Sequence, residues 1–101
     1  MNRSAFIVLS AGLAVSAAAF AKDVPPAELE ALVKSGAVLP QDKLDAAALA
    51  KHPGGTVQPG GEVEHHRRGY VYEVEVLDAQ GAEWDLDIDA KTGKVLKNER
   101  D

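Results

Sequence analysis

The stretch YVYEVEVLDAQGAEWDLDIDAKTGKVLKNERD, residues 70–101, decides the fold of this chain. It holds three segments of alternating or apolar-rich pattern, separated by Asp78-Ala79-Gln80-Gly81 and by Asp89-Ala90-Lys91-Thr92-Gly93. Aspartate and glycine in short breaks of this kind are typical of tight turns between antiparallel strands. The stretch therefore predicts an antiparallel β-meander with two tight turns.

The two faces of this meander follow from alternation, because successive side chains of a strand point to opposite sides. One predicted face is apolar and holds Tyr70, Tyr72, Val74, Val76, Trp84, Leu86 and Ile88. The acidic residues of the opposite face include Glu73, Glu75, Asp85 and Asp87. We expect helices to cover the apolar face and water to meet the acidic one. The polar end of the last strand, residues 97–101, is predicted to fray.

Two short helices are predicted upstream of the meander. The first begins near Pro25-Pro26, presents the stripe Leu29, Leu32 and Val33, and stops at Ser35-Gly36. The second covers residues 41–51, is rich in alanine, and ends at His52-Pro53-Gly54-Gly55. We expect its shallow apolar stripe to lie across the sheet, with His52 beside its C-terminus.

The region between the second helix and the meander, residues 56–68, has the least regular pattern. Short apolar pieces flank Pro59-Gly60-Gly61, and proline is confined to the edges and bulges of sheets. A broken or bulged edge strand is therefore predicted here.

The N-terminus has the layout of a secretory signal peptide. Arg3 precedes an apolar, alanine-rich run, and Ala19-Phe20-Ala21 is a small-x-small cleavage pattern before Lys22. We expect cleavage after Ala21, an N-terminal helical segment over residues 22–36 and one domain over residues 37–101. With no second apolar run of spanning length, the cleaved chain is expected to be soluble, in the periplasm or secreted.

Charge and cysteine content narrow the classes of partner. Cleavage would remove Arg3 and no acidic residue, leaving 10 basic against 16 acidic residues and a formal net charge of −6. This balance disfavours nucleic acid and anionic membranes and suits a basic peptide, a cation or a positively charged protein face. The absence of cysteine excludes disulfides and thiolate chemistry.

Several of these segments together resemble a PepSY domain. The resemblance rests on Leu39-Pro40, His52-Pro53-Gly54-Gly55, the YVYEVEV segment, the DAQG turn, Trp84 and the DAKTGKVL segment, and it covers about residues 31–101. It implies a small α+β fold with helix packed on one face of a curved antiparallel sheet, found outside the cytoplasm. It also implies a role in inhibiting or regulating peptidases, as in the propeptides of thermolysin-like metallopeptidases. The Pro59-Gly60-Gly61 segment departs from the smoother first strand of that family.

Two groups of residues are candidates for contact with a partner. Glu73, Glu75, Asp85 and Asp87 could receive a basic peptide or a divalent cation, or form a solvated face that keeps the sheet soluble. His65, His66, Arg67 and Arg68 form a basic segment that suits an acidic partner or a solvated hairpin loop. Adjacent histidines on a strand point to opposite faces, so no metal site and no cofactor are predicted there.

The sequence favours a binding function over an enzymatic one. Hydroxyl side chains of serine or threonine type after Ala21 are limited to Ser35, Thr56 and Thr92, and none has a histidine placed to activate it. The first hypothesis is a PepSY-type protein-binding module that modulates or inhibits an extracytoplasmic peptidase, or that binds another extracytoplasmic protein. The alternative is a cation-binding or envelope-associated structural protein that uses the acidic sheet face.

Overall fold

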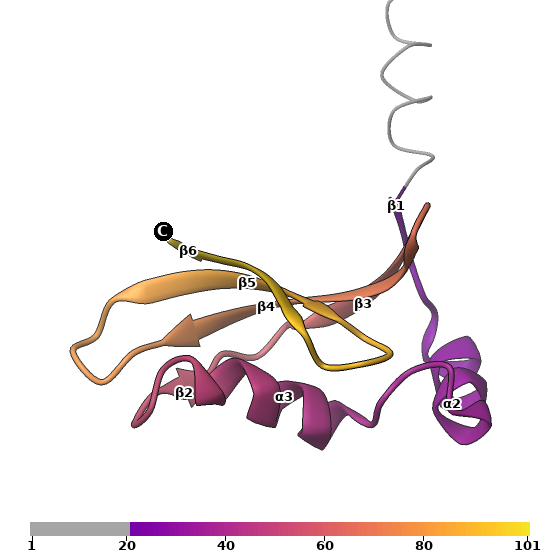
Figure 1. The fold of residues 1–101 in the computed structure, drawn as a ribbon, viewed down its shortest axis with the longest axis horizontal. Helices are drawn as coiled ribbons and strands as arrows, with labels where there is room; N and C mark the ends of the chain where they lie inside the picture. Colours follow the sequence, from indigo (N-terminus) through magenta and orange to yellow (C-terminus); the bar gives the residue numbers. More distant parts are fainter. Residues whose placement is uncertain (1–20) are drawn as a thin grey trace, which may run out of the picture.

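The computed structural model describes residues 21–101 as an α+β fold with one open antiparallel sheet (Figure 1). The predicted signal peptide, residues 1–21, lies outside the described residues except for Ala21. The strands pair in the order β1-β3-β4-β5-β6, and β2 pairs separately with β4. Their bounds are β1 Ala21–Asp23, β2 Thr56–Val57, β3 Glu62–His66, β4 Gly69–Leu77, β5 Glu83–Asp89 and β6 Val95–Arg100.

Both predicted helices are present. Helix α2 (Pro26–Ser35) begins with proline in its first turn and ends at Gly36, whose φ of 84° is the left-handed conformation that glycine tolerates. Helix α3 (Gln41–Ala50) follows the connector Leu39-Pro40. In Figure 1, α3 lies along one face of the sheet, while α2 stands near the end formed by β1 and β3.

The core lies between α3 and the apolar face of the sheet, as alternation predicts. Leu44 and Ala48 of α3 are buried together with side chains from three strands, Val63, Tyr72, Val74, Val76, Leu86 and Ile88. Trp84 and Tyr70 are half-buried at the margin of this cluster. Helix α2 contributes no fully buried residue, and its stripe Leu29, Leu32 and Val33 packs only partly against the core. One face of the sheet is thus covered and the other is left open.

The two predicted turns join the strands of the meander. Asp78 Oδ1 accepts hydrogen bonds from the backbone N–H groups of Gln80 (2.9 Å) and Ala82 (2.8 Å) between β4 and β5. Asp89 Oδ1 accepts one from Lys91 N (2.9 Å) between β5 and β6. Each aspartate therefore fixes its turn by satisfying backbone donors, which is why this residue type begins both breaks in the pattern.

The prediction of a broken strand near Pro59 is confirmed, but its position at the edge is only partly right. Both pieces, β2 and β3, pair with β4, and the residues around Pro59 loop out between them. Strand β3 is internal rather than an edge, because β1 pairs with its other side. A three-residue strand of Ala21, Lys22 and Asp23 has too little pattern to be recognised in the sequence.

The prediction of a frayed C-terminus is wrong. Strand β6 continues to Arg100, which pairs with Trp84, and Asp101 N donates to Glu83 O at 2.9 Å. Backbone pairing needs no apolar side chain, so the predicted last strand continues through its polar end. Within residues 21–101, none of the helices is long and apolar enough to cross a membrane.

Candidate functional site

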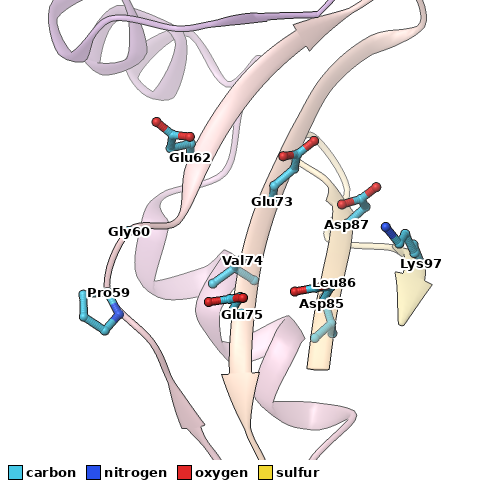
Figure 2. Close-up of a pocket in the computed structure, with 10 residues that line it drawn as sticks. All are labelled: Pro59, Gly60, Glu62, Glu73, Val74, Glu75, Asp85, Leu86, Asp87 and Lys97. Atoms are coloured by element: carbon cyan, nitrogen blue, oxygen red, sulfur yellow. The ribbon is translucent and has the colours of Figure 1, made fainter. Parts of the chain in front are cut away.

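The open face of the sheet forms an acidic concavity of about 380 Å³ (Figure 2). Figure 2 shows carboxylates rising into it from β3, β4 and β5, with Lys97 of β6 at one side and Pro59 at the other. Its acidic lining residues are Glu62, Glu73, Glu75, Asp85 and Asp87. The four acidic residues selected from the sequence therefore share one surface, and Glu62 joins them.

Strand register places these acids opposite one another. Glu73 is paired with Glu62 on one side and with Asp87 on the other, while Glu75 is paired with Asp85. Like charges directly opposite across strands destabilise a sheet. The face thus has a negative potential that a cationic group would relieve.

The pKa values of two of these carboxyls reflect this crowding. Partial burial, together with the Glu64 carboxyl and the Asp87 charge, raises the pKa of Glu73 to about 7, against the lowering effect of His66. Loss of hydration also raises the pKa of Glu75, helped by the charges of Asp85 and Glu83. Both groups would therefore be easier to ionise with a positive charge beside them.

The loop that contains Pro59 and Gly60 forms one rim of the concavity. Gln58 N donates to Glu75 O at 2.9 Å and Glu62 pairs with Glu73, so residues 59–61 loop out opposite Val74. Gly60 has a φ of 101°, a conformation that other residues rarely adopt. Pro59 and Gly60 therefore form a raised edge of the concavity rather than an open strand edge.

Only part of the predicted basic segment shares one surface. His65 stacks on Tyr70 with ring centroids 4.6 Å apart, whereas His66 Nε2 lies 3.1 Å from Glu64 Oε1. The two rings lie on opposite faces of β3, as alternation predicts. Arg67 and Arg68 make the two-residue turn between β3 and β4, where they line a shallow depression together with His66 and exposed Leu96.

Three site residues were not selected from the sequence: Glu62, Glu64 and Lys97. The place of Glu62 and Glu64 opposite β4 depends on strand register, which the pattern of their own segment does not reveal. Lys97 faces Asp87 through the pairing of β5 with β6, in the segment that was expected to fray. Glu62, Glu64 and His66 alternate along β3, and this alternation was the sequence signal that they share one face.

His52 lies just beyond the C-cap of α3, as expected, and its side chain also contacts β5 and β6. Its ring nitrogen Nε2 lies 2.8 Å from Asn98 Oδ1, and its ring packs on Trp84 with centroids 4.6 Å apart. The imidazole is buried and links the end of α3 to β6. We therefore assign it to the framework that holds the sheet against the helix.

The comparisons with known proteins point to one family. The family model described as "Peptidase propeptide and YPEB domain", PepSY, matches residues 38–99. The chain is also similar to "Uncharacterized protein YkoJ" of Bacillus subtilis (strain 168), with 37% identity over 60 residues. That match covers 58% of this chain and 35% of the relative. No solved structure matches the chain at a significant level.

Proposed function

This chain belongs to the PepSY family of peptidase propeptide and YPEB domains, and from this membership we propose that it binds a peptidase and modulates its activity. Domains of the family act generally as propeptide-like or regulatory modules, typically outside the cytoplasm. The proposal extends this to a specific contact surface, the acidic concavity of the open sheet face. Secretion by the predicted signal peptide would bring the chain to such a peptidase.

The observation that carries the proposal is the register of the acidic residues. Glu73 and Asp87 face each other across β4 and β5, and so do Glu75 and Asp85. Folding alone gains nothing from these like-charge pairs. A partner that brings lysine or arginine side chains into the concavity would neutralise them, and complementary charge also speeds association and selects partners. The expected contact on the peptidase is therefore a basic segment.

An extended segment of the partner would be held next to the concavity by β6. This strand is last in the sheet order, and β5 is its only strand neighbour among residues 21–101. Its outer edge has unpaired backbone groups, which an added strand can pair. The edge near Pro59 is less suited, because β2 and β3 already occupy that side of β4.

An inhibition assay with a thermolysin-like metallopeptidase and a fluorogenic peptide substrate tests the proposal. The purified protein should reduce turnover in a saturable way, and the effect should weaken as salt rises, because exposed charges are screened. The double variant Glu75→Gln/Asp85→Asn should weaken the apparent inhibition constant by at least about tenfold, or ~1.4 kcal/mol.

A matched control removes the same charge from elsewhere. Glu28 and Glu30 lie exposed on α2, away from the concavity, so Glu28→Gln/Glu30→Gln should inhibit like the wild type. Equal loss in both double variants would show that net charge alone matters and would contradict the assigned surface. No binding to any member of a panel of secreted peptidases would contradict the function itself.

A further inference from the structure

Three metal-ligating side chains meet at the turn end of the β3–β4 hairpin. Glu64 and His66 are two residues apart on β3 and share a face, and Glu73 reaches them from β4. One ligand atom from each lies within 4.8 Å of the other two. This group lies outside the residues that carry the proposed peptidase contact, except for Glu73.

The distances within this group suit a small divalent ion. His66 Nε2 is 3.1 Å from Glu64 Oε1 and 4.0 Å from Glu73 Oε2. Ligand atoms about 2.0–2.1 Å from a tetrahedral Zn²⁺ ion are roughly 3.3 Å apart. The first pair therefore already has about this separation, whereas the Glu73 carboxylate must move closer, which a half-exposed side chain can do.

The chemistry of the donors selects the class of metal. Imidazole nitrogen suits zinc and related transition metals, whereas calcium and magnesium prefer oxygen ligands alone. Two carboxylates balance the charge of a divalent ion. Three protein ligands also leave a fourth tetrahedral position for water.

We propose that Glu64, His66 and Glu73 form a zinc-binding site on the open face of the sheet. The ligands come from adjacent positions of one hairpin, so the backbone pairing of β3 with β4 fixes their spacing. Side-chain exposures of 17%, 33% and 42% for Glu64, His66 and Glu73 leave a path for the ion to enter.

The charges around this group of three side chains favour the binding of a cation. Two further acidic residues lie beside the ligand carboxylates. Asp87 of β5 is paired with Glu73, and Asp23 of β1 is paired with Glu64. A bound divalent ion would offset the repulsion among these carboxylates.

Isothermal titration calorimetry of the purified protein with ZnCl₂ near pH 7.5 tests the proposal. One zinc per chain should bind and raise the melting temperature in a way that EDTA reverses. Each of the variants Glu64→Gln, His66→Gln and Glu73→Gln should weaken zinc affinity at least about tenfold.

The adjacent histidine supplies a matched control. His65 stacks on Tyr70 on the opposite face, so His65→Gln should bind zinc like the wild type. Melting curves in EDTA confirm that each variant folds, and cobalt absorption spectra of the folded variants report whether an imidazole is still a ligand. No saturable zinc binding, or equal loss in His65→Gln and His66→Gln, would overturn the proposal.

Discussion

At the scale of single residues, Tyr72 links the buried core of the sheet to a polar side chain of α3. It is 2% exposed, and its hydroxyl donates to Asp45 Oδ1 of α3 at 2.6 Å. Burial, reinforced by this hydrogen bond, raises the pKa of the phenol. Gly61 lies over the same hydroxyl, so closely that a Cβ there would stand 2.5 Å from the Tyr72 oxygen. This glycine is required for space, since its φ is not positive.

Gly61→Ala should therefore destabilise the protein by about 1–3 kcal/mol, the usual range for overpacking. The added methyl group would push the Tyr72 ring away from Asp45 and weaken their hydrogen bond. Urea unfolding of Gly61→Ala, Tyr72→Phe and the double variant measures this coupling. The double variant should cost about 1 kcal/mol less than the sum of the single ones; additive costs would contradict the steric explanation.

Glu73 makes stability depend on pH. Its pKa is raised from 4.5 to about 7 in the folded state, so the folded protein binds more protons than the unfolded chain between these values. Stability must then fall as pH rises through this window. Since the side chain is 42% exposed, solvent screening reduces the effect to about 1 kcal/mol.

Glu73→Gln should remove this dependence. We expect the variant to be about 1 kcal/mol more stable than the wild type near pH 8 and nearly equal to it near pH 5. Urea unfolding at several pH values in EDTA measures the difference. Glu28→Gln on α2 is the control and should follow the wild-type profile. A Glu73→Gln variant that kept the full wild-type slope would contradict the assignment to Glu73.

At the scale of secondary structure elements, β6 shows how a polar strand is kept in place. Five of its six residues are exposed, so burial stabilises it little. Asn98 supplies a specific contact through its 2.8 Å hydrogen bond with buried His52, whose ring packs on Trp84. The end of α3, β5 and β6 are thereby linked by three side chains.

Asn98→Ala should loosen β6 by about 1 kcal/mol, because it leaves a buried imidazole nitrogen without its partner. Hydrogen exchange of the β6 amides should become faster while the amides of β4 stay protected. Glu99→Ala, at the adjacent exposed position, is the control and should leave exchange unchanged. Uniform acceleration across the whole sheet in Asn98→Ala would instead indicate a global loss of stability.

The same elements show what the sequence could predict. Alternation from Tyr70 to Ile88 identified the covered face, which holds Tyr72, Val74, Val76, Leu86 and Ile88, and the aspartates at 78 and 89 marked both turns. It could not reveal β1, whose three residues carry no pattern, or that the polar end of β6 stays paired. The group of Glu64, His66 and Glu73 depends on cross-strand register, which a single strand's pattern does not contain.

At the scale of the whole molecule, the two faces of the sheet have opposite effects on stability. The covered face buries the apolar cluster against α3, while the open face concentrates the acids of a chain that carries a net charge of −5. These acids face one another directly across strands. The domain thus tolerates local repulsion on the surface that we assign to partner binding, as expected where binding and stability make different demands.

Salt should therefore stabilise the protein. Raising NaCl from about 20 mM to about 500 mM shortens the screening length well below the size of the concavity, so the melting temperature should rise by a few degrees. Glu75→Gln/Asp85→Asn should melt higher than the wild type at low salt and gain less from added salt, because one like-charge pair is gone. Glu28→Gln/Glu30→Gln changes net charge equally but leaves the concavity intact, so it should keep the larger part of the wild-type salt response. Differential scanning calorimetry measures these melting temperatures. Equal salt responses in the two double variants would show that repulsion is spread over the whole surface instead of being concentrated on the open sheet face.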